Sequence, residues 1–331
     1  MPPAVPAGKA TTAELEAFEL VAKGRALLAQ RGPAARVARQ CLERAIQLDP
    51  DNADAHAALG DTLLSLVRYG LLAVPEARPL IRSALDRAIA LAPQMGTLMG
   101  SLASVSLFLE HDVEAAFRWW ERALAAQPHL VEVRAQYATL GLIYLRHDDA
   151  RGLAELSRAV TDDPRSAYCA TLHSLSLLAA GRPADAVAEV QRACALDPQS
   201  FLPLFVRTYV LSLSGDADGA LAAANAAYAV IGRTPWVLAC LPNAYVQRGQ
   251  LNLAEAIYAE LQARAQTEQV SCMVLALAAD QLGRTDEAIA YAIESVERSD
   301  NTGPLWTRAP LFSAAFHAHP RYPELLRAIG L

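Results

Sequence analysis

In this chain of 331 residues, two closely spaced histidines are the first candidates for chemistry. His317 and His319 are two positions apart, so two imidazoles could lie near one metal ion. No acidic residue or cysteine follows them at ligand spacing, however, and the apolar run before them favours a packed C-terminal segment. We therefore predict no metal site.

Two other histidines are followed by acidic residues, in the pair His111–Asp112 and in the triplet His147–Asp148–Asp149. Both sequences fall where one predicted helix ends and the next begins. Aspartate at such a place commonly caps the following helix by accepting hydrogen bonds from its first N–H groups. These aspartates are predicted to cap helices and to take no part in catalysis.

The five cysteines include no Cys-x-x-Cys pair, which fits reduced and mostly buried thiols better than disulfides or zinc ligands. Cys169 and Cys194 fall within one predicted unit, and a structural thiol is favoured over a nucleophile there. No glycine-rich phosphate loop, Gly-x-Ser-x-Gly or His-Glu-x-x-His sequence occurs. We expect no catalytic residue, no cofactor and no enzymatic activity.

The composition indicates what kind of scaffold carries these residues. Hydrophobic residues make up 53% of the chain, charged residues 19% and aromatic residues only 6%. Alanine is abundant, which favours helices over β-sandwiches and barrels. The net charge is −6, the only lysines are Lys9 and Lys23, and the arginines are scattered. Nucleic acid is therefore not an expected partner.

Membrane insertion and secretion are not expected either. No run of 18 apolar residues occurs, and the richest stretch, residues 201–213, is interrupted by Arg207. The first twelve residues lack the apolar core of a secretory signal. These features predict a cytoplasmic protein.

The chain is repetitive. An Ala-rich or Leu-rich helical stretch followed by a proline recurs at intervals of 43, 35, 36 and 34 residues, at Pro50, Pro93, Pro128, Pro164 and Pro198. Each interval contains a second interruption at a glycine or a polar turn. The pattern therefore predicts units of two helices that each end at a proline.

This spacing resembles the tetratricopeptide repeat (TPR), in which small residues at fixed positions let two helices pack closely. In the unit that begins at Ala167, Ala186 and Ala193 occupy consensus positions 20 and 27, and Pro198 occupies position 32. The unit that begins at residue 97 places Ala116, Trp120 and Ala123 at positions 20, 24 and 27. The resemblance implies an all-α, right-handed superhelix with a concave binding face.

We expect about eight helix pairs followed by a C-terminal cap. The pairs are predicted at about 14–48, 53–91, 95–126, 130–161, 166–196, 200–232, 235–264 and 268–298. Residues 1–13 are predicted to be a disordered tail, residues 14–301 a continuous array, and residues 302–331 a capping segment that covers the last apolar face.

A closer resemblance links the chain to TPR arrays that are fused behind catalytic or DNA-binding domains in bacterial adenylate cyclases, protein kinases and winged-helix regulators. It is carried by residues 16–31, by the extended second unit at 71–93 and by the ending at 309–331. None of these stretches is a catalytic motif, and the array is expected to be either free-standing or part of a longer protein. The resemblance implies a regulatory or adaptor array.

In TPR proteins the ligand is usually held by the inward face of the first helix of each unit. The corresponding positions begin acidic, with Asp54 and Asp61, and then become apolar and aromatic. The predicted binding groove consists of Phe108, Tyr168, Phe205, Tyr209, Trp236, Asn243 and Met273. Some TPR proteins grip acidic C-terminal tails with a carboxylate clamp, which needs a cation and an asparagine at fixed positions. Asn243 fits the asparagine position, but Ala239 occupies the position of the cation, so this clamp is missing. The alternative is that some of these residues pack inside a tightly wound superhelix.

Three functions follow from this pattern. The first is a non-enzymatic protein-binding module whose groove accepts a helix or an extended segment of a protein partner. The second is a sensory array that encloses a small apolar ligand. The third is an enzyme on a TPR scaffold, for which no convergent polar cluster is evident.

Overall fold

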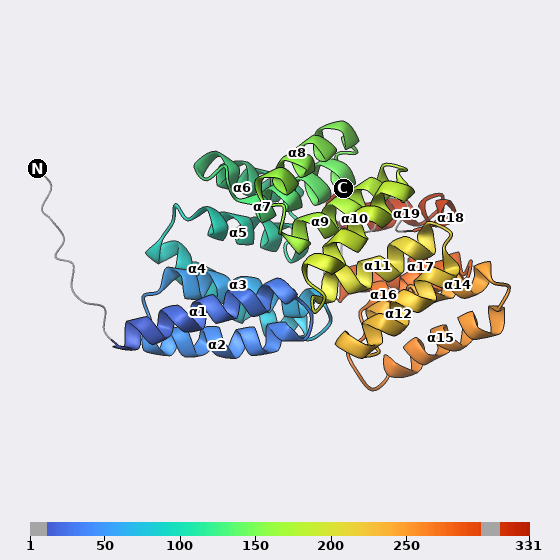
Figure 1. Ribbon diagram of the computed structural model, residues 1–331, viewed down its shortest axis with the longest axis horizontal. Coiled ribbons are helices and arrows are strands. Elements are labelled where there is room, and N and C mark those ends of the chain that lie inside the picture. Colours follow the sequence, from blue (N-terminus) through green and yellow to red (C-terminus); the bar gives the residue numbers. More distant parts are fainter. Residues whose placement is uncertain (1–11, 299–311) are drawn as a thin grey trace, which may run out of the picture.

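The protein is described by a computed structural model that covers residues 12–298 and 312–331. Every regular element in these ranges is a helix (Figure 1). The helices are α1 (Thr12–Gln30), α2 (Ala34–Leu48), α3 (Ala53–Arg68), α4 (Val74–Leu91), α5 (Gly96–Phe108), α6 (Val113–Ala126), α7 (Val131–Gln136), η1 (Tyr137–Leu145), α8 (Asp149–Asp162), α9 (Ala167–Ala179), α10 (Pro183–Leu196), α11 (Phe201–Leu213), α12 (Ala217–Ile231), α13 (Pro235–Leu238), α14 (Leu241–Gln247), α15 (Leu251–Arg264), α16 (Cys272–Gln281), α17 (Thr285–Glu297), α18 (Ala314–His317) and α19 (Tyr322–Ala328).

Within residues 12–298 and 312–331, the predicted all-α superhelix of eight helix pairs is confirmed. Two pairs have an interrupted first helix: α7 continues into the π-helical segment η1, and α13 is separated from α14 at residues 239–240. Neither interruption was expected from the sequence, because apolar periodicity does not distinguish the wider π-helical turns from α-helical ones. None of the helices in the described ranges combines the length and the apolar character that a membrane crossing requires.

The repeated prolines stand where the helices end, as predicted. Pro50, for example, is the second residue after α2, and Pro198 is the second residue after α10. The predicted aspartate caps are also confirmed. Asp112 accepts a hydrogen bond from the Ala115 N–H at 2.8 Å, and Asp148 accepts one from the Arg151 N–H at 3.1 Å.

The turn inside most helix pairs needs one residue in the left-handed backbone region. Glycine fills this place in several pairs, as at Gly181, whose φ is 73°. His111 and His147 occupy the same place in the third and fourth pairs, with φ of 55° and 54°. These two histidines are therefore turn residues, each directly before its capping aspartate.

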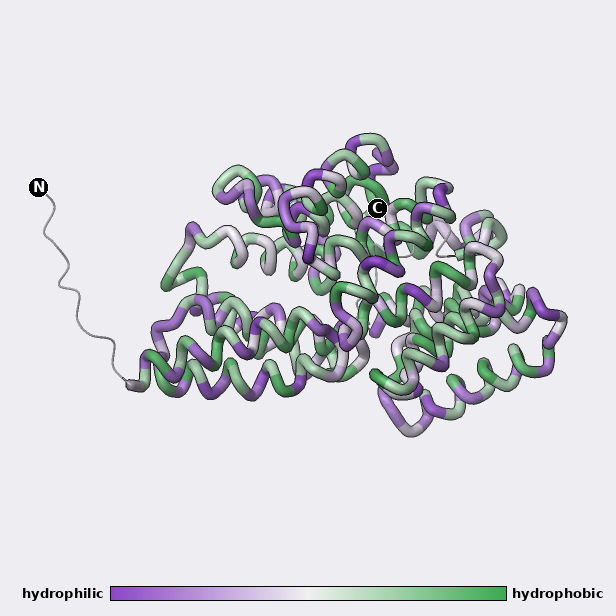
Figure 2. The backbone as a smooth tube through the Cα atoms, viewed as in Figure 1, coloured by the Kyte–Doolittle hydropathy of each residue, from purple (hydrophilic) through white to green (hydrophobic). Residues whose placement is uncertain are grey.

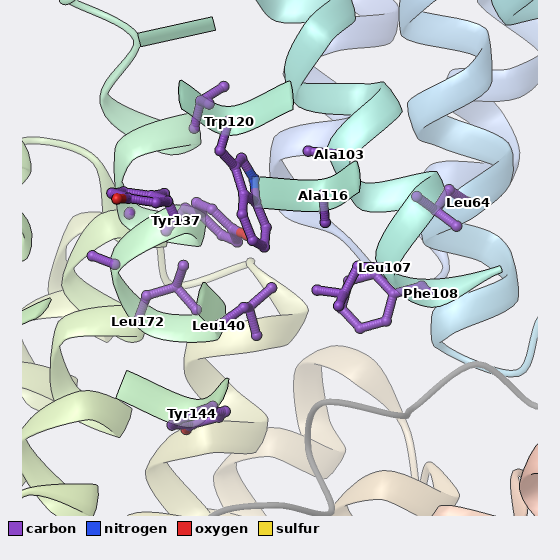
Figure 3. Packing of buried hydrophobic residues seen from close by; sticks show 14 of the residues in the cluster. Leu64, Ala103, Leu107, Phe108, Ala116, Trp120, Tyr137, Leu140, Tyr144 and Leu172 are labelled. Atoms are coloured by element: carbon purple, nitrogen blue, oxygen red, sulfur yellow. The ribbon is translucent and has the colours of Figure 1, made fainter. Parts of the chain in front are cut away.

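Small residues let the helices of each pair approach closely. Ala186 and Ala193 on α10 are fully buried, as are Ala116 and Ala123 on α6. Hydrophobic and hydrophilic segments alternate along the outer helix α2, as expected for a helix with one buried face (Figure 2). Trp120 lies in the core beside Tyr137, with ring centroids 6.1 Å apart (Figure 3).

The superhelix closes on itself after about five helix pairs. The turn after α1 meets the beginning of α11, where the blue and yellow segments adjoin in Figure 1. The extended second unit adds Tyr69, whose ring lies 4.9 Å from that of Phe201 and 6.4 Å from that of Trp236. These contacts place the first two helix pairs against the sixth and seventh.

The buried residues form two main clusters. One runs from α2 to α11, and the other runs from α11 to the C-terminal helices. Tyr69, Leu175, Phe205 and Leu213 pack against both clusters. These four residues therefore join the two halves of the molecule.

The C-terminal helices α18 and α19 pack on the last helix pair. Phe316 and Leu325 are fully buried in the second cluster, and the Ser313 hydroxyl and N–H each donate a hydrogen bond of 2.7 Å to Asp280 on α16. The described part of the predicted cap, residues 312–331, thus packs against this helix pair, and its capping role stays a prediction. The predicted tail falls largely on residues 1–11, and the boundary between array and cap on residues 299–311, so both lie outside the described residues and stay predictions.

Candidate functional site

The residues of the sequence-predicted groove lie on the inner side of the superhelix, but most are covered. Phe108, Tyr168, Tyr209, Trp236 and Met273 are each between 1% and 8% exposed. Phe205 and Asn243 are half-buried. The inner faces that the TPR pattern identifies are therefore packed against one another within the closed turn.

The structure brings three of these residues together around Phe205. The rings of Phe205 and Tyr209 on α11 are stacked at 6.2 Å, and the Trp236 ring of α13 meets Phe205 edge-on at 5.4 Å. Phe108, Tyr168 and Met273 lie elsewhere, on α5, α9 and α16.

The side chain of Asn243 already has intramolecular partners. Its Nδ2 donates hydrogen bonds to the carbonyl oxygen of Ser212 at 3.0 Å and to the Ser212 hydroxyl at 3.1 Å. Its backbone N–H donates to Gln281 at 3.0 Å. In this conformation Asn243 links α14 to α11 and α16. That the seven predicted groove residues bind a partner stays a prediction.

A pocket of about 340 Å³ with a mixed polar and apolar lining remains open on the inner side of the first four helix pairs. It lies between α1, α3, α5 and α7, and three of its lining residues are arginines, so we call it the arginine pocket. Its charged and hydroxyl-bearing or amide-bearing lining residues are Arg25, Arg31, Asp61, Ser65, Arg68, Thr97, Ser101, Ser104, Glu132 and Gln136.

The three arginines are held in different ways. Arg31 forms an ion pair with Glu132 at 3.1 Å and lies 4.3 Å above the ring of Tyr168. Arg25 pairs with Asp54 at 2.9 Å. Arg68 lies 4.3 Å above the ring of Phe108, and no carboxylate of the described residues forms an ion pair with it. One of the three guanidinium groups is therefore positioned but not neutralised.

Asp61 is a half-buried acid of this pocket. Burial raises its pKa to about 6, although a hydrogen bond with Ser101 and the charges of Arg31 and Arg25 act in the opposite direction. A carboxyl group with this pKa changes its charge within the physiological pH range. The charge of the pocket therefore varies with pH.

One hydroxyl group that lines the pocket has no partner within the described structure. Ser65 is 4% exposed, and its Oγ makes no hydrogen bond. Buried polar groups almost always find a partner, so this orphan hydroxyl calls for an explanation.

Only part of this pocket could be predicted from the repeat pattern. Asp61 is among the inward-facing positions of the TPR pattern, but the arginines are not. Arg31 lies in the turn after α1 and Arg68 is the last residue of α3. The sequence feature that could have drawn attention to Arg68 is the extended second unit, whose additional residues lie around this position.

The other candidates for chemistry have structural partners. Burial raises the pKa of the Cys169 thiol to about 12 and that of Cys194 to about 11, so both are protonated at neutral pH. His317 bonds to the Ser313 carbonyl and His319 to Asp286, each at 2.9 Å. Residues 12–298 and 312–331 contain no group of three or more side chains arranged to hold a metal ion.

Comparison with known families agrees with the geometry of the helix pairs. A model described as "TPR repeat" matches residues 38–66, which span most of α2 and α3. A second, described as "Tetratricopeptide repeat", matches residues 270–302, which include α16 and α17. The chain is a tetratricopeptide-repeat protein. No curated protein matches the sequence of this TPR protein.

Solved structures share the fold of this TPR protein at low sequence identity. A chain of the APC/C hetero-tetramer Cut9–Hcn1 matches with a TM-score of 0.59 and 15% identity, over 94% of this chain and 55% of that one. The human IFIT1 dimer with PPP-AAAA matches with a TM-score of 0.55 and 16% identity, over 85% of this chain and 72% of that one. Both likenesses concern the fold.

Proposed function

We propose that this TPR protein is a non-enzymatic adaptor or regulatory module that binds a peptide segment of a partner protein in the arginine pocket. TPR repeats support a protein-interaction scaffold. The observation that carries the choice of site is that the arginine pocket is open, whereas five residues of the predicted aromatic groove are covered. A peptide can reach the former without a rearrangement of the superhelix.

The chemistry of the lining supports a peptide over a small apolar ligand. Hydroxyl, amide and charged side chains such as Ser65, Ser104 and Gln136 line the pocket beside aliphatic ones, a mixture that suits a peptide with both polar backbone and apolar side chains. Groups of this kind can pair with the backbone amides of an extended segment. The thiols of Cys169 and Cys194 are protonated, and Asp112 and Asp148 cap helices. None of these groups supports the alternative that the protein is an enzyme. The five free cysteines fit our proposal of a cytoplasmic setting.

The seven residues of the sequence-predicted groove remain a separate proposal. They would form a second, apolar surface for a partner only after the contacts between Tyr69, Phe201 and Trp236 separate. We also propose a regulatory role, which the resemblance to TPR arrays fused behind effector domains supports.

A nucleic acid is the second candidate ligand because the IFIT1 structure, which shares the fold, contains PPP-AAAA. The net charge of −6 and the presence of Asp61 and Glu132 in the pocket oppose a polyanion. Both candidates can be tested in one assay.

The test selects random peptides displayed on phage against the whole chain and then compares two tryptophan variants. Thr97→Trp places a large ring at the half-buried rim of the arginine pocket, and Gln191→Trp places the same ring on the exposed face of α10. Selected peptides should lose binding at least tenfold with Thr97→Trp and bind Gln191→Trp as they bind the unchanged protein. Selection of no peptide, or equal binding by both variants, would contradict the proposal. Binding of PPP-AAAA that Thr97→Trp abolishes would favour the nucleic-acid reading.

A further inference from the structure

The position of Arg68 indicates which group the arginine pocket recognises. Its guanidinium carbon lies 4.3 Å from the centroid of the Phe108 ring, which holds the group in place, and it lacks an ion-pair partner among the described residues. A guanidinium presents two parallel N–H groups that match the two oxygens of a carboxylate. An oriented arginine at the wall of an open pocket is thus prepared for an anion.

Ser65 supplies a second and independent observation. It is three residues before Arg68 on α3, so the two side chains lie on one face of the helix. Both line the pocket, and the buried Ser65 Oγ has no hydrogen-bond partner there. A ligand oxygen within reach of both groups would satisfy the hydroxyl and neutralise the guanidinium at once.

The balance of charge sets the size of the anion. Arg25 is paired with Asp54 and Arg31 with Glu132, so Arg68 is the lining arginine whose charge has no ion-pair partner among the described residues. One unpaired guanidinium matches one carboxylate. A phosphate chain would bring several negative charges close to Asp61 and Glu132, which is unfavourable.

We infer that the arginine pocket binds a carboxylate group of the partner peptide, held by the guanidinium of Arg68 and the hydroxyl of Ser65, with Arg31 beside them. This inference rests on the proposed peptide-binding function. The carboxylate comes either from the C-terminus of the peptide or from an aspartate or glutamate side chain, and the two sources offer the same pair of oxygens.

Asp61 makes this binding depend on pH. It faces Arg25 and Arg31 from α1 and its following turn, Ser101 from α5, and Glu132 and His129 from α7 and the turn before it. A bound carboxylate disfavours the ionised form of Asp61 and so raises its pKa above about 6. Binding therefore takes up a proton, and affinity increases as the pH falls from about 7.5 to about 5.5. Below about pH 4.5 the ligand carboxylate itself becomes protonated, and affinity falls.

The experiment uses one peptide selected on the whole chain, with a fluorescent label at its N-terminus. It is synthesised with a free C-terminal carboxylate, as the C-terminal amide, and with each acidic side chain replaced by its amide. Fluorescence polarisation should show a loss of about tenfold or more when the recognised carboxylate is removed. The form that loses affinity identifies the source of the carboxylate.

Variants of the protein test the residues. Arg68→Gln should weaken the parent peptide about tenfold and Ser65→Ala severalfold, whereas Arg165→Gln, at an exposed arginine in the turn before α9, should have no effect. Arg68→Lys keeps the charge but not the paired donors and should lie between Arg68→Gln and the unchanged protein. Thermal melting checks that each variant is folded.

Two results would overturn the inference and leave the proposed function standing. The first is a peptide whose binding is blocked by Thr97→Trp but is the same for the acid and all amide forms. The second is an affinity that stays the same between pH 7.5 and pH 5.5. This measurement uses the unmodified protein, so it does not depend on whether a variant folds. Failure of the proposed function is a different result, since then no selected peptide responds to Thr97→Trp.

Discussion

The hydroxyl group of Ser200 donates a hydrogen bond to the backbone carbonyl of Gln30 at 3.1 Å, although 170 positions separate the two residues. Gln30 ends α1, and Ser200 directly precedes α11. The bond fixes the place where the superhelix meets itself. It explains why the inner faces of the helix pairs are covered and why the open space is limited to pockets such as the one around Arg68.

Replacement of Gly32 by alanine should destabilise this junction. Gly32 has φ of 54°, and a Cβ on it would lie 2.5 Å from the side chain of Phe201. We expect a loss of about 1 to 3 kcal/mol in the free energy of unfolding, measured by urea denaturation. Gly181→Ala is the matched control because Gly181 has φ of 73° but open space around it. Equal losses in the two variants would show that the contact with Phe201 contributes nothing.

Enlargement of Ala193 tests the close packing within the fifth helix pair. Ala193 is fully buried on α10, at the position where the repeat requires a small residue. Ala193→Leu should force the two helices apart and cost about 1 to 3 kcal/mol. Gln191→Leu, two residues earlier on the exposed face, should melt within a degree or two of the unchanged protein. An unaltered melting temperature for Ala193→Leu would exclude this register.

Removal of the Asp112 cap should weaken the start of α6. Its side chain accepts a hydrogen bond from the Ala115 N–H at 2.8 Å, and without it this N–H loses its partner. Asp112→Ala should cost about 1 kcal/mol, whereas Asp112→Asn should cost much less because asparagine caps helices equally well. If both variants were equally destabilised in urea, the charge of Asp112 and not its capping bond would be the cause.

The acid stability of the protein should depend on Glu189. Burial alone would raise the pKa of Glu189, but hydrogen bonds from His173 and Arg192 outweigh that effect and lower the pKa to about 2. Because the pKa is lower in the folded state, Glu189 stabilises the fold above its ordinary value of 4.5, and this contribution disappears as the pH falls from 4.5 to 2. It amounts to about 2 to 3 kcal/mol.

The measurement compares the free energy of unfolding of the unchanged protein with that of Glu189→Gln at pH 7, 4 and 2.5. The difference between the two proteins should shrink steadily as the pH decreases. A difference that stays constant over this range would mean that Glu189 contributes through packing alone.

Local sequence signals predicted the helix pairs well. Pro50 and its counterparts marked the helix ends, Asp112 and Asp148 marked the helix starts, and Ala193 marked a close contact, because each acts on residues nearby in the chain. These features repeat with the unit and can be read without knowledge of the superhelix.

The closure of the superhelix was not predictable in the same way. The contact of Tyr69 with Phe201 joins units that are far apart in sequence, and no repeat pattern records how many units complete a turn. The repeat pattern assigned Tyr209 and Trp236 to inward-facing positions, and both side chains are buried. The pattern could not show that the inner side is filled by the protein itself, or that Arg68 at a helix end reaches the space that remains.

The division of the core into two clusters has a consequence for how the molecule folds. Contacts between neighbouring helix pairs are local and form quickly, whereas the junction around Tyr69, Leu175, Phe205 and Leu213 requires a loop of well over a hundred residues to close. Each half can therefore assemble as its own cooperative unit before the halves dock. Hydrogen exchange should then detect an intermediate in which the amides of α3 and α11 near the junction exchange while those in the centre of each cluster stay protected.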